Sequence, residues 1–240
     1  AVTRHDVKAV EYLIGEYLEA ASGKLGEGTT LPSLREVVHI FCTSEDINNL
    51  AYALTIKAAT EQVWLPAIRA LLDRLHGLAE AGAAVPMLAH THGQPATPVT
   101  IGKEMAVFAH RLSRQIKRVE ATEYLGKING ATGTWAAHVV SVPGADWPTL
   151  ARSFVEGLGL TWNPLTTQIE SHDWQAELYS DVARAGRIAH NLATDAWTYI
   201  SMDYFHQNLA AQGSTGSSTM PHKVNPIRFE NAEANLEVSN

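Results

Sequence analysis

The chain has 240 residues, of which 45% are hydrophobic and 18% charged, a composition typical of a globular protein with a substantial core. Acidic residues outnumber basic ones by 25 to 18, and the net charge of −7 argues against a nucleic-acid or membrane-surface binder, because both need a basic face.

The one cysteine, Cys42, allows neither an intrachain disulfide nor a cysteine zinc site, so we expect a reducing, cytoplasmic compartment. No apolar run is long enough for a bilayer, and we expect no membrane partner. Because the chain begins at Ala1 without a methionine, we expect the natural protein to extend beyond both ends.

The N-terminal region predicts a helix over residues 5–21, followed by a glycine-rich break over residues 23–30. Pro32 then favours the start of a short helix, since its fixed φ suits a first turn. Within residues 5–21, apolar residues recur at the spacing that places them on one helix face. They are Val7, Val10, Leu13, Ile14 and Leu18.

A first long helix is predicted over residues 43–78. Ser44 is the expected N-cap, with Thr43 beside it as a second capping residue, and Glu45 and Asp46 complement the helix dipole in the first turn. Pro66 should kink this helix, because proline removes one backbone hydrogen bond.

Two more long helices are predicted, one over residues 97–125 with Pro98 near its first turn and one over residues 172–209. A loop or short extended segment at 126–134 and a short helix at 148–158 lie between them. Apolar residues keep helical register along the long segments. They are Ile101, Met105, Phe108, Leu112, Leu178, Val182, Ala185, Ala189, Leu192, Ala196 and Ile200.

The three long helices exceed the usual mean length of about 11–12 residues and bear alanine-rich apolar stripes. We therefore expect an all-α fold built as a long up-and-down helix bundle rather than a compact globin-like packing. Apolar stripes of this length need partner subunits to be covered, so we expect an oligomer.

Residues 213–226, GSTGSSTMPHKVNP, interrupt the helical pattern with a hydroxyl-rich loop, after which another helix is expected. Glycine and small hydroxyl residues let several backbone N–H groups face one anion, and the following helix adds the positive end of its dipole. Lys223 and Asn225 would stabilise a carboxylate that gains negative charge. Either Ser217 or Ser218 could act as the proton acceptor. The alternative is a mobile surface loop with incidental serines.

His92 lies in a predicted loop, HTHGQPATP at residues 90–98, directly before a long helix. A histidine titrates near neutrality, so His92 is a candidate general acid or base. A core or surface histidine without a catalytic role is the alternative. The two histidines one residue apart have no third ligand at metal-site spacing, and we expect no metal.

Three more polar stretches lie near predicted helix ends. RHDVKAVE (4–11) offers either donors for phosphate and hydroxyl groups or a simple helix cap. VVHIFCTSEDINN (37–49) places hydroxyl groups where a helix N-terminus could receive an anion. TTQIESHD (166–173) offers a glutamine at what is otherwise a plain helix entry. An elongated bundle could bring such ends together, across subunit boundaries if necessary. The candidates are Arg4, His5, Asp6, His39, Thr43, Ser44 and Gln168.

GSSTMPHKVNP, residues 216–226, resembles the signature loop of the fumarase/aspartase superfamily, whose members eliminate fumarate from succinyl substrates. Within that superfamily, RHDVKAVE, CTSEDINN, THGQPATP and TTQIESHD are similar to stretches of the adenylosuccinate lyase family, of the bacterial purine-biosynthesis type. They are less similar to fumarase or argininosuccinate lyase. The resemblance runs over essentially the whole chain.

The resemblance implies a carbon–nitrogen lyase that needs no cofactor. It would cleave adenylosuccinate to AMP and fumarate, and the succinyl-carboxamide ribotide SAICAR to AICAR and fumarate. It would be an all-α homotetramer with a joint central helical bundle and active sites each built from three subunits. Residues 1–30 would be the end of an N-terminal helical domain and residues 31–240 the central long-helix domain, with the family's C-terminal part missing.

By motif position, the resemblance implies that Ser217 is the general base and His92 the general acid. Lys223 and Asn225 would hold the succinyl carboxylate. The GTWAAH stretch at 133–138 departs from the more polar family pattern, so no site residue is implied there, and the sequence just before the signature is slightly longer than usual. The implied substrate-binding residues are Arg4, His5, Asp6, His39, Thr43, Ser44, Thr91, Gln168, Ser218, Met220, Lys223 and Asn225.

Two other interpretations stay open at this point. One is a sister lyase of the same superfamily with a different leaving group, against which the flanking motifs argue. The other is a catalytically silent or truncated helical scaffold. The intact Ser217, His92 and Lys223 count against a silent protein.

Overall fold

The computed structural model describes residues 4–25, 30–208, 219–220 and 222–239. The chain divides into two compact units. The first unit consists of the chain up to Glu61 together with Glu123–Gln175, and the second of Gln62–Thr122 and the chain from Ala176 onward. The expected mainly helical class is confirmed, while the predicted domain boundary after residue 30 stays a prediction. Among the described helices, none has both the length and the apolar character of a bilayer span.

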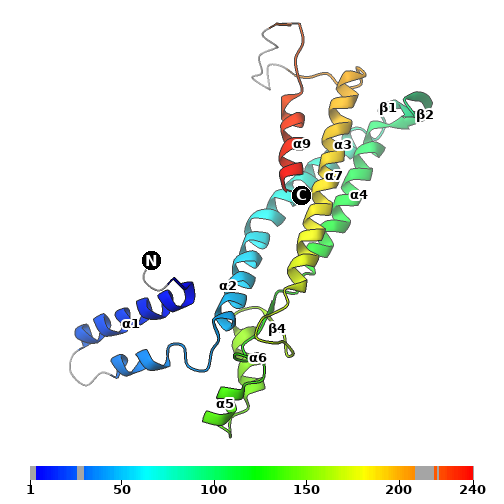
Figure 1. Ribbon diagram of the computed structural model, residues 1–240. Coiled ribbons are helices and arrows are strands. Elements are labelled where there is room, and N and C mark those ends of the chain that lie inside the picture. Colours follow the sequence, from blue (N-terminus) through cyan, green and yellow to red (C-terminus); the bar gives the residue numbers. More distant parts are fainter. Residues whose placement is uncertain (1–3, 26–29, 209–218, 221, 240) are drawn as a thin grey trace. The chain divides into compact units, whose positions relative to one another are not determined.

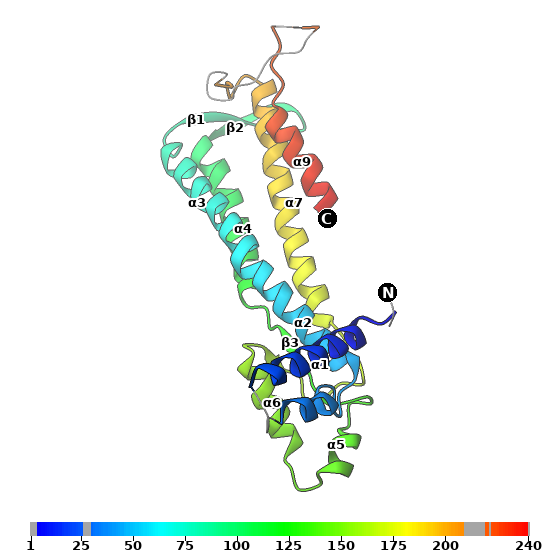
Figure 2. The same cartoon turned by 90° about the vertical axis from the view of Figure 1, so that its left-hand side faces the viewer.

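Long helices build the second unit. Figures 1 and 2 show α3 (Leu65–Ala81), α4 (Ile101–Glu120) and α7 (Asp173–Ser201) side by side. Apolar side chains on their facing sides form a buried core, which confirms the expected packing of long helices through apolar stripes. This core consists of Leu75, Met105, Phe108, Ala109, Leu112, Ala185 and Ile188.

The last helix, α9 (Ile227–Ser239), begins directly after Pro226, as expected, and lies beside α7 (Figures 1 and 2). Thr194 and Trp197 of α7 both donate hydrogen bonds to Oε1 of Glu233, the tryptophan at 2.9 Å. These bonds, the Thr194 one first, lower the pKa of the Glu233 carboxyl. Between α3, α7 and α9 remains an apolar hollow of about 560 Å³, lined among others by Trp64, Ile68, Leu192, Phe229 and Leu236.

The predicted helix over residues 43–78 is confirmed as a continuous run of helical backbone. It consists of α2 (Ser44–Ala59), a π-helical turn (Thr60–Trp64) and α3. The π turn ends at Trp64, two residues before Pro66, and Pro66 has no N–H for the carbonyl of Gln62, which lies in that turn. A wider turn relieves the crowding between the proline ring and that carbonyl, so the local response to Pro66 is a change of helix type.

A β-hairpin replaces the expected loop and the start of the helix over residues 97–125. It pairs β1 (Pro86–Thr91) with β2 (Gln94–Thr100), and α4 begins only at Ile101. The expectation that Pro98 lies in the first helical turn is wrong, because Pro98 lies in β2 opposite Leu88. Thr100 is the N-cap instead, and its hydroxyl oxygen accepts a hydrogen bond from the Lys103 N–H at 3.2 Å.

The third long helix, α7, ends at Ser201 rather than at residue 209. Asp203 has a φ of +60°, and its N–H donates to the Ile200 carbonyl at 3.2 Å. The next N–H, of Tyr204, donates to the Tyr199 carbonyl at 2.9 Å. This pair of bonds around a left-handed residue is the Schellman arrangement that ends helices, and here aspartate takes the place of the usual glycine.

In the first unit, α1 (Asp6–Leu25) is followed by the 3-10 helix η1 (Leu31–Val37), which begins with the turn that contains Pro32, as expected. Figures 1 and 2 show the two side by side. Of the apolar stripe on α1, Val7 is buried, whereas Val10 and Leu13 are about half exposed. The stripe is therefore only partly covered within this chain.

Short elements complete the first unit. The parallel strands β3 (Leu125–Gly126) and β4 (Thr161–Trp162) pair with each other, and α5 (Ala136–Ser141) and α6 (Trp147–Gly157) lie between them in sequence. The predicted helix at 148–158 is confirmed as α6, whereas α5 was not expected.

Candidate functional site

The N-terminal end of α2 gathers candidate residues from three separate stretches of the first unit. The Ser44 hydroxyl lies 3.4 Å from Nε2 of His5. The side-chain amide of Gln168 donates a hydrogen bond to the Thr43 hydroxyl oxygen at 3.0 Å. We call these four residues the α2 entrance. Because the first backbone N–H groups of a helix face its entrance and its dipole is positive there, the α2 entrance suits an anionic or hydroxyl-rich ligand.

The cap of α2 differs from the prediction. Thr43 is the N-cap, with extended backbone, and Ser44 is the first helical residue, so the assignment of the cap to Ser44 is wrong. The Thr43 N–H donates to Oδ2 of Asp46 at 3.0 Å, the return half of a capping box. Ser44 is thereby left to direct its hydroxyl toward His5.

A buried ion pair lies directly behind the α2 entrance. Nζ of Lys127 donates to Oδ1 of Asp46 at 2.8 Å, and neither side chain has any exposed surface. The same carboxylate accepts the backbone N–H groups of Asn129 at 3.0 Å and Gly130 at 3.1 Å. Asn49 adds two bonds, because its side chain accepts from the Lys127 N–H at 2.8 Å and donates to the Lys127 carbonyl at 3.0 Å. Residues 127–130 are thus tied to α2.

The segment that bears Gln168 is held by a second buried carboxylate. Glu170, which has no exposed surface, accepts the Asn163 side-chain amide at 3.0 Å and the His172 N–H at 2.7 Å. The Asn129 side chain donates to the Thr166 hydroxyl oxygen at 2.7 Å and so links this segment to residues 127–130. The position of Gln168 therefore depends on groups buried beneath it.

The remaining first-unit candidates lie outside this hydrogen-bonded set. Asp6 accepts the N–H of the next residue, Val7, at 2.8 Å, whereas the bond that caps α1 is made by His5, whose Nδ1 accepts the Lys8 N–H at 3.3 Å. Arg4 is exposed and has a φ of +50°. His39 is half-buried, and within the described structure its Nε2 has no hydrogen-bond partner.

In the second unit, His92 occupies the tip of the hairpin. His92 and Gly93 have φ angles of +54° and +72°, and the flanking Thr91 and Gln94 are paired, which is the two-residue turn typical of hairpins. Thr91 and His92 are exposed. The Tyr204 hydroxyl donates to the Leu88 carbonyl at 2.9 Å and anchors the hairpin to the chain that follows α7.

The signature loop is described only in part. Ser217 and Ser218 lie outside the described residues, so their predicted roles stay predictions. Met220 and Lys223 are exposed, and the Lys223 N–H donates to the Met220 carbonyl at 2.9 Å. Asn225 is half-buried just before α9. The Gln207 amide donates to the Val224 carbonyl at 2.8 Å and fixes this end of the loop.

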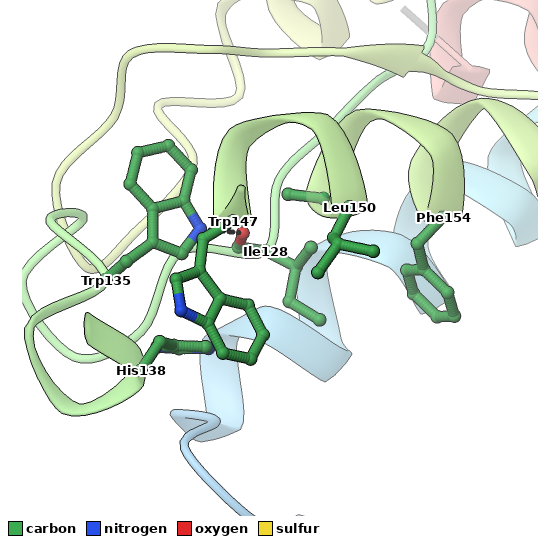
Figure 3. A pocket seen from close by; sticks show the side chains of 7 residues that line it. Ile128, Trp135, His138, Trp147, Leu150 and Phe154 are labelled. Carbon is green, nitrogen blue, oxygen red and sulfur yellow. Dashed lines mark hydrogen bonds between the residues drawn. The ribbon is translucent and has the colours of Figure 1, made fainter. Parts of the chain in front are cut away.

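An aromatic pocket in the first unit was not expected from the sequence (Figure 3). The His138 ring lies 4.8 Å from the Trp147 ring and 5.1 Å from the Phe41 ring. Burial lowers the pKa of His138, and the nearby Asp46 opposes this shift less strongly. The indole N–H groups of Trp135 and Trp147 donate to the Ile128 and Val142 carbonyls, so the pocket of about 170 Å³ is mainly apolar.

Comparison with known proteins identifies the class. A family model described as Lyase matches residues 2–237, and the chain belongs to this lyase family. It is 50% identical over 238 residues to the adenylosuccinate lyase of Escherichia coli (strain K12) and 48% identical over 238 residues to that of Haemophilus influenzae. Both alignments cover 99% of this chain and 50% of the relative, so the chain spans about half the length of the curated relatives it matches.

Solved structures show the same fold. A fumarate lyase from Mesorhizobium sp. BNC1 superimposes with a TM-score of 0.70 at 24% identity, covering 98% of this chain and 50% of that one. The fold expected from the signature loop is thereby confirmed, and so is the resemblance to adenylosuccinate lyases.

Gly133→Ala should displace the segment that bears Gln168. Gly133 has a φ of +74°, and an added Cβ would lie 2.2 Å from the Thr166 carbonyl oxygen. We expect the free energy of unfolding to fall by at least about 2 kcal/mol in urea titrations, from backbone strain plus the clash. Gly157→Ala is the matched control, because its Cβ would meet no atom within 4 Å and its φ is not positive. Equal stability of the two variants would contradict this account.

His138 should make folding stability depend on pH. Burial lowers its folded pKa below the ordinary 6.5, so the unfolded chain binds the proton more readily than the folded one. The free energy of unfolding should therefore be highest above about pH 6.5 and fall as the pH drops through and below that value. His138→Phe keeps an aromatic ring but cannot titrate, and urea unfolding from pH 8 to pH 5 should show a weaker decline. An unchanged decline would show that other groups cause it.

Proposed function

We propose that the protein acts as an adenylosuccinate lyase that releases fumarate from adenylosuccinate to give AMP, and from SAICAR to give AICAR. The observation that carries this proposal is the 50% identity to an adenylosuccinate lyase along 99% of the chain. The four residues of the α2 entrance support it, because a hydroxyl-rich helix N-terminus suits a nucleotide. The protein would act in the cytoplasm without a cofactor.

The reaction is an elimination that needs one base and one acid. Ser217, deprotonated to its alkoxide, takes the proton from the carbon next to a succinyl carboxylate and becomes a hydroxyl, the electron pair forms the new carbon–carbon double bond, and the carbon–nitrogen bond breaks. His92 donates a proton to the departing nitrogen. Lys223 and Asn225 stabilise the carboxylate that takes up charge in the carbanion. Fumarate and the free amine of the nucleotide result.

The other candidates would bind the nucleotide and the succinyl group. Their roles rest on motif position, and for four of them the hydrogen bonds at the α2 entrance add support. The proposed binding residues are Arg4, His5, Asp6, His39, Thr43, Ser44, Thr91, Gln168, Ser218, Met220, Lys223 and Asn225.

The active protein would be a homotetramer whose sites are shared between subunits. The position of His92 at the exposed tip of a hairpin supports this, because a general acid must be desolvated by surrounding groups to act on a bound substrate. The apolar hollow between α3, α7 and α9 is a surface that a neighbouring subunit would cover.

Fumarate release from a panel of substrates tests the proposal. The full-length protein is offered adenylosuccinate, SAICAR, argininosuccinate, malate and aspartate, and the absorbance of fumarate is followed. We expect release from the first two alone. Release from argininosuccinate, malate or aspartate would instead assign a sister lyase, and release from none would leave a silent scaffold.

Ser217→Ala should abolish turnover and leave AMP binding intact, because the hydroxyl acts on the proton and not on the nucleotide. Ser218→Ala is the matched comparison, and it should raise KM while turnover persists. We would measure kcat and KM for adenylosuccinate, and AMP affinity by calorimetry. The opposite pattern would assign the base to Ser218.

A further inference from the structure

We propose that Asp46 and Lys127 are positioning residues for nucleotide binding: their buried pair sets the geometry in which the α2 entrance meets the substrate. Neither side chain is exposed, so neither would touch the ligand. Their effect would be transmitted through Thr43 and Gln168. This inference rests on the proposed function, since it assumes that a nucleotide binds at the α2 entrance.

One carboxylate joins two stretches of backbone, the cap of α2 and residues 127–130. Oδ1 of Asp46 accepts from Lys127 Nζ and the Asn129 N–H, and Oδ2 accepts from the Thr43 and Gly130 N–H groups, all between 2.8 and 3.1 Å. These four donors match the roughly four lone-pair positions of an ionised carboxylate. Asp46 therefore fixes the cap of α2 and residues 127–130 in one arrangement.

Stability alone does not account for a buried pair at this position. Removing two charges from water costs about as much as their attraction returns, and apolar pairs of the same size are often equally stable. What an apolar pair lacks is the set of acceptor positions that orient three backbone N–H groups. The geometry that Asp46 imposes is therefore the property that requires a carboxylate, and Lys127 balances its charge.

The hydrogen bonds of Asp46 are part of a closed chain of contacts that includes Thr43 and Gln168 of the α2 entrance. Residues 127–130, fixed by Asp46, hold the Thr166 segment through the Asn129 amide at 2.7 Å. That segment leads to Gln168, whose side-chain amide donates a hydrogen bond to the Thr43 hydroxyl oxygen at 3.0 Å. A change at Asp46 would therefore shift Thr43 and Gln168 relative to each other, and the ligand would lose one or both contacts.

Two variants of the full-length protein separate positioning from stability. Asp46→Asn leaves the Lys127 charge buried without its partner, so its melting temperature should fall strongly. Asp46→Asn combined with Lys127→Met removes both charges at similar volume and should recover most of that loss. The asparagine still directs an NH2 group at backbone donors, so AMP affinity and 1/KM for adenylosuccinate should remain roughly tenfold lower, the loss of about one hydrogen bond.

AMP binding by calorimetry decides the outcome, because it needs no turnover. A double variant with recovered melting temperature and wild-type AMP affinity overturns the positioning role, whereas recovered stability with weakened affinity supports it. Asp181→Asn is the control: it breaks the 2.7 Å ion pair with Arg118 in the second unit and should not change AMP affinity. Fumarate release by the unmutated protein is measured first, so a failure of the proposed activity is recognised separately.

Discussion

The first unit depends on a carboxylate that has no free lone pair. Asp46 and Lys127 are 81 positions apart in sequence, yet their 2.8 Å contact brings the cap of α2 and the loop after β3 to one place. One helical turn later, two hydrogen bonds between the Asn49 side chain and the Lys127 backbone join α2 to the same loop. Gly126 then permits the close approach, because a Cβ there would lie 2.7 Å from the Leu50 side chain. The polar end of the unit is therefore organised by burial of charge rather than by surface contacts.

The candidate residues differ in how firmly the surrounding structure holds them. Of the α2 entrance, Thr43 is held by the buried Asp46 and the segment of Gln168 by the buried Glu170, and the four entrance residues are joined in pairs by hydrogen-bond contacts. His92 and Lys223, in contrast, lie exposed on a turn and on the segment before α9. This division suits the proposed chemistry, because recognition of the nucleotide gains from preorganisation, whereas proton transfer by His92 and stabilisation of the carboxylate by Lys223 need groups that close over the substrate and open again.

Sequence patterns predicted the long helices well, because a buried stripe repeats every three to four residues over many turns. They failed where local signals had two explanations: Pro98 suits a first helical turn but also an edge strand, and either Thr43 or Ser44 could cap α2. Asp46 was assigned to the helix dipole, since nothing in its neighbourhood reveals a lysine far along the chain. The predicted roles of Ser217 and Ser218 rest on motif position alone.

The backbone conformation of His92 lowers the folding stability of the hairpin, whatever the side chain does. Its φ of +54° is one that glycine or asparagine adopts with less strain, and a two-residue hairpin turn favours those residues. Histidine at this position therefore lowers the stability of the hairpin that presents it. If His92 serves as the proton donor, stability favours glycine or asparagine at this position whereas catalysis requires histidine. Selection for stability alone would then replace the catalytic histidine.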